Sequence, residues 1–187
     1  MPRLFTAIRI PTDIAAQLAR FREPLPGARW IEPQNYHLTL RFIGDVTTPV
    51  AREFADHLSR LELDGFEIRL RGFGVFGGHD PKALWAGIDA PSQLDALYRA
   101  NERAARAAGL KPERQKFKPH VTIARFRHTR IEAVSRFLQR HAASASMPIY
   151  VDRFYLISSK PHSGGGPYVV EQEFALHNYA WADEYED

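Results

Sequence analysis

The chain has 187 residues, of which 44% are hydrophobic and 25% charged, a composition that supports a full hydrophobic core and argues against disorder. The formal net charge of +3 and the isoelectric point near 9.3 favour anionic partners only mildly and do not indicate a polybasic arm. Because the chain has no cysteine, disulfides, thiolate metal sites and a cysteine nucleophile are excluded.

No segment of the sequence is typical of export or membrane insertion. The first residues, MPRLFTAIRIP, lack the apolar core of about 7–15 residues that a signal peptide needs. No run approaches the ~18 apolar residues of a membrane span. We therefore expect a soluble, cytoplasmic protein that does not bind membranes. We also expect a monomer, although no feature of the sequence determines the oligomeric state.

Helix and strand patterns follow one another without a change in composition that would mark a linker. Alternation predicts strands, and amphipathic stretches that open at Pro, Ser or Thr predict helices. In chain order, we expect strand 3–10, helix 12–21, short strand 29–31, strand 36–43, helix 47–61 with Thr48 as N-cap, strands 66–76 and 82–89, helix 91–109, strand 117–126, helix 130–141, and strands 147–159 and 168–176. This mixed order with hairpins predicts an α+β fold with antiparallel sheets rather than a doubly wound parallel sheet.

Two of the predicted strands carry a histidine and a threonine two positions apart. They are YHLTLRF, with His37 and Thr39, and FKPHVTIARF, with His120 and Thr122. Residues i and i+2 of a strand share a face and lie about 7 Å apart, so each strand offers an imidazole beside a hydroxyl. Each half of the chain contains one such strand followed by a helix. This repeat predicts two similar lobes around one cleft, within a single domain that spans residues 1–187.

Two imidazoles and two hydroxyls around one pocket suit a phosphodiester. A neutral imidazole can take a proton from an attacking water, while a protonated one gives a proton to the leaving oxygen. The hydroxyls of Thr39 and Thr122 can donate hydrogen bonds to phosphoryl oxygens, which gain charge in the transition state. Because the ordinary pKa of imidazole is about 6.5, both protonation states are accessible at neutral pH, and no metal or other cofactor is needed. The spacing is symmetric and does not say which histidine is the acid.

The segments RLFTAIRIP, HLTLRFIGD, ALWAGI and FKPHVTIARF resemble the 2H phosphoesterases, and among them the RNA 2′,3′-cyclic phosphodiesterases, which are also called 2′-5′ RNA ligases. The resemblance extends from residue 3 to about residue 170. It implies a bilobal fold, with two pseudo-symmetric lobes of antiparallel β-sheet and outer helices around a central cleft. It also implies hydrolysis of the 2′,3′-cyclic phosphate at an RNA 3′ end to a 2′-phosphate, with His37 as general acid and His120 as general base.

The family tends to have an arginine after the second motif, and Arg125 matches it. In a strictly alternating strand Arg125 would face away from Thr122, so its role as a phosphate ligand requires a β-bulge. Arg41, directly after the first motif, is a weaker phosphate candidate. Candidates for stacking on a base are Trp30, Tyr36, Phe42, Trp85 and Phe126. Further candidates for substrate contact are Lys118, Arg127 and the glycine-rich loop 158–168, with Ser158, Lys160 and His162.

The residues also leave other functions open. The same site could join 2′,3′-cyclic and 5′-hydroxyl ends into a 2′-5′ linkage, cleave 2′-5′ oligonucleotides, or act on other small cyclic phosphates. The chain could instead bind RNA ends without catalysis, or hydrolyse them with a metal. Substrate panels, histidine variants that still bind, and a chelator separate these possibilities. No spacing of histidines and carboxylates typical of a metal site supports the last one.

Overall fold

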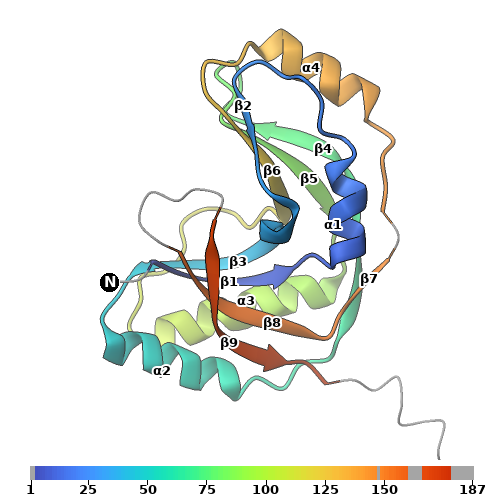
Figure 1. Cartoon of the computed structure of the whole chain (residues 1–187). Helices are drawn as coiled ribbons and strands as arrows, with labels where there is room; N and C mark the ends of the chain where they lie inside the picture. Colours follow the sequence, from blue (N-terminus) through green and yellow to red (C-terminus); the bar gives the residue numbers. More distant parts are fainter. Residues whose placement is uncertain (1–2, 147, 160–165, 178–187) are drawn as a thin grey trace, which may run out of the picture.

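The computed structural model describes residues 3–146, 148–159 and 166–177, which form a curved antiparallel sheet with helices on its outside (Figure 1). The strands are β1 (Arg3–Arg9), β2 (Ala28–Trp30), β3 (His37–Asp45), β4 (Phe66–Phe76), β5 (Ala83–Asp89), β6 (His120–Phe126), β7 (Ile149–Val151), β8 (Arg153–Ser159) and β9 (Tyr168–Ala175). The helices are α1 (Thr12–Ala19), α2 (Thr48–Ser59), α3 (Ser92–Ala107) and α4 (Ile131–Arg140), with a 3₁₀ turn η1 (Pro33–Asn35). The predicted α+β fold is confirmed.

The two motif strands, β3 and β6, meet in the middle of the sheet, whose strand order is β7-β4-β5-β6-β3-β1-β8-β9, with β2 paired to β6. They pair through a single position, Leu38 opposite Val121. In an antiparallel pair the flanking positions run in opposite order, so each motif histidine stands toward the threonine of the other motif. The Leu38–Val121 pair is thus the centre of an approximate two-fold relation between the motifs.

Each motif belongs to a different half of the sheet. The half with β6 also contains β2, β4, β5 and β7, and α4 packs on its strand β4. The half with β3 contains β1, β8 and β9, and is covered by α3, on which α2 packs (Figure 1). The chain passes between the halves several times, so the halves of the sheet are not successive halves of the sequence.

Several expected boundaries differ from the observed ones. The single strand expected at 147–159 is two strands separated at Asp152, because β7 pairs with β4 whereas β8 pairs with β1 and β9. The strand expected from residue 117 begins at His120, directly after Pro119, which has no N–H to offer a ladder. The N-cap of α2 is Thr47 rather than Thr48, and it makes no side-chain capping bond.

Candidate active site

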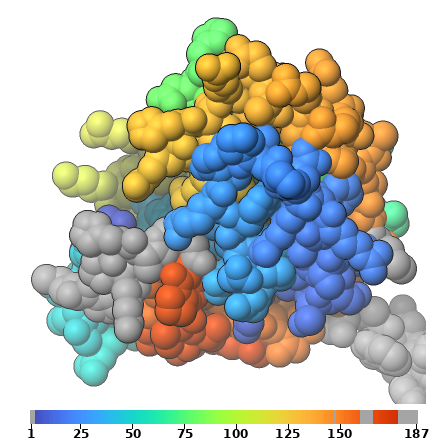
Figure 2. All heavy atoms as spheres, turned by 45° about the horizontal axis from the view of Figure 1, so that its top comes forward, coloured from blue at the N-terminus to red at the C-terminus, as the bar shows by residue number. Residues whose placement is uncertain are grey.

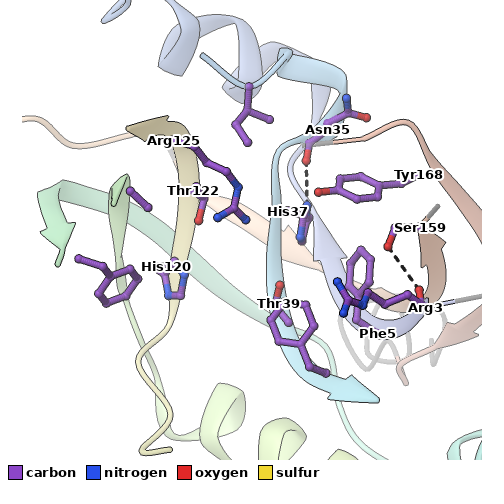
Figure 3. Close-up of a pocket in the computed structure, with 14 residues that line it drawn as sticks. Arg3, Phe5, Asn35, His37, Thr39, His120, Thr122, Arg125, Ser159 and Tyr168 are labelled. Atoms are coloured by element: carbon purple, nitrogen blue, oxygen red, sulfur yellow. Dashed lines mark hydrogen bonds between the residues drawn. The ribbon is translucent and has the colours of Figure 1, made fainter. Parts of the chain in front are cut away.

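The side chains predicted to carry the chemistry line one cavity of about 260 Å³ between the two halves of the sheet (Figure 3). Leu38 and Leu40 of the first motif and Val121 and Ile123 of the second are buried in the core, so the alternate positions face the cavity. The predicted residues that line it are His37, Thr39, His120, Thr122 and Arg125. Local alternation and the meeting of β3 with β6 bring the two histidines and two threonines together, and a β-bulge in β6 adds Arg125.

Both histidines are held by the same type of hydrogen bond, between ring Nδ1 and the carbonyl oxygen two residues earlier. The Nδ1 of His37 lies 2.8 Å from the carbonyl oxygen of Asn35, and the Nδ1 of His120 lies 2.6 Å from that of Lys118. A carbonyl can only accept, so each Nδ1 must carry the proton and donate it. In the neutral imidazole, Nε2 is then the atom with a free lone pair. Each ring is therefore fixed in the tautomer that exchanges a proton through Nε2.

Burial and neighbouring cations hold both imidazoles neutral in the free protein. Burial lowers the pKa of His37 to about 4, with smaller contributions from His120 and Arg125, while the bond to Asn35 opposes the shift. Burial also lowers the pKa of His120, helped by the charges of Lys118 and Arg125. At neutral pH the free protein is thus ready to accept a proton at either ring. A bound phosphate anion would favour the protonated form.

Aromatic rings flank each imidazole. The ring of His37 lies 5.0 Å from those of Phe5 and Tyr168, measured between centroids. The ring of His120 lies 4.8 Å from Phe76 and 6.0 Å from Trp85. This packing restricts ring rotation and removes water from one side of each imidazole, which contributes to the burial that lowers both pKa values.

The β-bulge required for Arg125 is present. In the β5–β6 ladder, Leu84 pairs with Ala124 and Trp85 with Thr122, so Ile123 is an extra residue without a partner in β5. The alternation shifts there by one position, and Arg125 faces the cavity, where it points toward His37 (Figure 3). The expected re-aiming of this side chain is confirmed.

The first motif has the same irregularity at the same place. In the β1–β3 ladder, Thr6 pairs with Arg41 and Ala7 with Thr39, which leaves Leu40 as the extra residue. The side chain five positions after the histidine is therefore aimed into the cavity in both strands, and in the first it is Phe42. Arg125 and Phe42 occupy equivalent positions of the two motifs.

Arg41 does not line this cavity, contrary to the suggestion that it contacts the phosphate there. The bulge at Leu40 turns Arg41 into the opposite face, where it is only 7% exposed. Its guanidinium lies 2.6 Å from Glu102 and 3.4 Å from Glu113 and donates to the carbonyl of Lys111. Arg41 therefore has a structural role, because it pairs with two glutamates on the face of β3 opposite the cavity.

The cavity also contains residues that sequence reasoning missed. Arg3, Ser159 and Tyr168 form one row across β1, β8 and β9, because Arg3 pairs with Ser159 and Ser159 with Tyr168. Phe5 and Asn35 complete this side of the cavity (Figure 3). Arg3 and Phe5 alternate along β1, and this pattern could have placed both side chains on one face. The positions of Ser159 and Tyr168 depend on which strands pair, and local pattern does not reveal that.

The other predicted contact residues lie in different places, some at the cavity and some in the core. Phe42 lines the cavity, whereas Tyr36 and Phe126 are buried in the core. Trp30 packs against Phe137, and Trp85 lies beside His120 without lining the cavity. Ser158 is buried and donates to Glu171, and its neighbour Ser159 is the serine at the cavity. Lys160 and His162 lie outside the described residues.

Within residues 3–146, 148–159 and 166–177, no three His, Asp or Glu side chains gather closely enough to hold a metal ion. Over the same ranges, none of the helices has the length and apolar character required to cross a bilayer.

Two imidazoles that exchange protons at Nε2, two hydroxyl donors and a guanidinium around one cavity are the components of acid–base chemistry on a phosphoester. The fold and the site together define a phosphoesterase.

Comparison with known proteins agrees with this class. The LigT-like phosphoesterase family model matches residues 8–85 and 88–168. The chain is 37% identical to the RNA 2′,3′-cyclic phosphodiesterase of Aeropyrum pernix over 123 residues, 63% of this chain and 70% of that protein. It is 33% identical to the RNA 2′,3′-cyclic phosphodiesterase of Aquifex aeolicus over 153 residues, 79% and 81% of the two chains. The crystal structure of E. coli LigT complexed with 3′-AMP matches with a TM-score of 0.74 and 25% identity, over 94% of this chain and 99% of that one. The chain belongs to the LigT-like phosphoesterase family.

Proposed function

We propose that this chain, as one bilobal domain, hydrolyses the 2′,3′-cyclic phosphate at RNA 3′ ends to a 2′-phosphate without a metal ion. The observation that carries the proposal is the matched pair of Nδ1 bonds, which leaves the Nε2 atoms of His37 and His120 for proton transfer. The names of the Aeropyrum and Aquifex relatives support the substrate. A monomeric state and a cytoplasmic location belong to the same proposal.

In the proposed reaction, Nε2 of His120 takes a proton from a water molecule as the water oxygen bonds to phosphorus. The bond from phosphorus to O3′ breaks, and protonated Nε2 of His37 gives its proton to O3′. The products are a 3′-hydroxyl and a 2′-phosphate. At the end of the reaction His37 is neutral, and His120 carries the proton that it took from water. The assignment of acid and base follows the family resemblance, because the hydrogen bonds of the two rings are equivalent.

Three side chains stabilise the phosphoryl group in this proposal. Thr39 and Thr122 donate hydrogen bonds to non-bridging oxygens, and Arg125 supplies a fixed positive charge. The negative phosphate also raises the pKa of His37 from its low value in the free protein. Substrate binding thereby creates the protonated acid that the leaving oxygen needs.

The test uses a short RNA that ends in a 2′,3′-cyclic phosphate, with EDTA present. We expect the parent protein to form only the 2′-phosphate, and His37→Ala and His120→Ala to lose about 10²–10⁴-fold in rate. His79→Ala is the matched control, because His79 is exposed in the β4–β5 turn, away from the cavity. Turnover that disappears with EDTA, or a 3′-phosphate product, would contradict the proposal.

A second activity of the same site, on 2′-5′ linkages, is favoured by one observation. The cavity shares Ile31, Asn35 and Tyr168 with a further groove that also includes Arg9 and Arg29. Figure 2 shows the light-blue segment around residues 29–35 beside the orange-red strand β9, which together form this groove. In a 2′-5′ diester a second nucleotide follows the phosphate and would lie in this groove. A 2′,3′-cyclic end has no such nucleotide. Incubation with a 5′-hydroxyl RNA and with a 2′-5′ dinucleotide tests joining and cleavage separately.

A further inference from the structure

A second groove opens from the opposite side of the catalytic cavity. It has a volume of about 320 Å³ and shares Thr39, Phe42, Phe76 and His120 with the cavity. From these residues it continues along the segment 115–118 toward Tyr98. A ligand in the cavity could therefore extend into this groove without leaving the protein surface.

Positive charge continues from the cavity into the groove. Lys116, Lys118, His120 and Thr122 are alternate residues leading into and along β6, and both lysines line the groove. The position of Lys118 is tied to the catalytic ring, because its carbonyl accepts the Nδ1 proton of His120. Its ammonium lies 4.6 Å from the ring centroid of Trp85 and 5.7 Å from that of Phe76. The lysine next to the cavity thus has a defined position.

Neither lysine is neutralised by an acidic neighbour in the described part of the chain. No ion pair of Lys116 or Lys118 with a carboxylate is found there. The acidic side chain that lines the groove is Glu113, which pairs with Arg41 and accepts backbone N–H bonds from Arg114 and Gln115. The groove therefore retains two uncompensated positive charges.

The other wall of the groove is aromatic. Tyr98 and Phe117 stack with ring centroids 4.1 Å apart and an angle of 2° between the rings. Phe42, at the boundary with the cavity, is 58% exposed. Aromatic rings beside lysines that follow one line are typical of surfaces that bind single-stranded nucleic acid, because rings stack on bases and ammonium groups pair with phosphates.

We propose that this groove binds the nucleotide on the 5′ side of the cyclic end. Lys118 contacts the phosphodiester that joins the last two nucleotides, and the base of the penultimate nucleotide lies beside the Tyr98–Phe117 pair. Lys116 lies farther along the same line and faces the next phosphate. This inference rests on the proposed function, and it makes an oligonucleotide, rather than a free cyclic nucleotide, the preferred substrate.

The experiment compares three substrates: a nucleoside 2′,3′-cyclic phosphate, a dinucleotide ending in the same group, and that dinucleotide with a neutral methylphosphonate at its internal linkage. Each is given to the parent, to Lys118→Met and to Lys111→Met. Met keeps the apolar stem of the lysine. Lys111 is the control, because it lies in the same loop without lining the groove. We expect the parent to prefer the charged dinucleotide about fivefold in kcat/KM, as for one solvent-exposed ion pair.

Lys118→Met should lose that preference and Lys111→Met should keep it, and the methylphosphonate should abolish the preference in the parent. The salt dependence of kcat/KM for the dinucleotide should also fall by about 0.7 in log–log slope, the value for one phosphate contact on a single strand. Equal losses on mononucleotide and dinucleotide would overturn the groove and make Lys118 a positioning residue for His120. Equal parent rates on all three substrates would also overturn it. If the parent turned over none of them, the proposed function itself would fail, which is a separate and recognisable result.

Discussion

Arg41 and Arg125 follow the two motifs at similar distances, and the structure gives them opposite roles that a pair of substitutions can test. Arg41→Met removes a buried guanidinium that lies 2.6 Å from Glu102 and 3.4 Å from Glu113. Removing one partner of a buried ion pair costs about 3–5 kcal/mol, because the remaining charge is left without a partner. The side chains of Glu102 and Glu113 are 18% and 30% exposed, so water offsets part of this cost. We therefore expect a loss of about 3 kcal/mol.

For a chain of this length, about 3 kcal/mol corresponds to a fall in Tm of about 6–12 °C. Arg125→Met should leave Tm nearly unchanged, because Arg125 is exposed at the cavity. Its effect should be on kcat/KM, by about 10²-fold, as for one lost transition-state donor. Thermal unfolding followed by circular dichroism gives the Tm. Rates on a cyclic-phosphate RNA, measured below the Tm of each variant, give kcat/KM.

The reasoning about the bulges would be refuted by the reverse pattern. If Arg41→Met kept its Tm and lost activity, Arg41 would have to reach the substrate and the bulge at Leu40 would be misassigned. A double variant sharpens the test. Replacing Glu102 by Leu together with Arg41→Met removes the stranded carboxylate, so part of the lost stability should return.

Three further outcomes are expected. Because burial lowers the pKa of His37 to about 4 in the folded protein, against about 6.5 unfolded, its contribution to stability is full above pH 6.5 and is lost as pH falls toward 4. Between pH 7.5 and pH 5, the free energy of unfolding of the parent should therefore fall by about 1–2 kcal/mol more than that of His37→Ala, as measured by urea titration. Thr122→Val should lower kcat/KM about tenfold through one lost hydrogen bond, whereas Thr122→Ser should keep most of the rate, and equal losses in both would contradict this role. Phe42→Ala should lower kcat/KM about tenfold for a cyclic nucleotide but leave ribose 2′,3′-cyclic phosphate, which has no base, unaffected.

The sequence was informative where function depends on local alternation. His37 and Thr39 share a face because strand geometry requires it, and the buried leucines between and after them confirm that face. The same argument placed His120 beside Thr122. It needed no knowledge of which strands pair, so it predicted the chemistry of the site before its shape.

Local alternation could not reach the features that depend on register. The row formed by Arg3, Ser159 and Tyr168 exists because β8 lies between β1 and β9. β1 is far from β8 in the sequence, since Arg3 and Ser159 are separated by 156 positions. The role of Arg41 was misjudged for a related reason. Whether a residue after the motif faces the cavity depends on a bulge, and a bulge is a property of two paired strands.

The two motifs are nearly symmetric, but the side chains around the two imidazoles differ. Both imidazoles have the same Nδ1 bond, so the difference must come from their surroundings. At His120, part of the pKa lowering comes from Lys118, which lies in the groove beyond the cavity and would not be neutralised by a cyclic phosphate. At His37, the lowering comes chiefly from burial and then from the charges of His120 and Arg125, and a phosphate held by Arg125 would oppose the two charge contributions. A bound phosphate therefore favours the protonated form of either ring, and the proposed assignment of His37 as acid and His120 as base rests on the family resemblance.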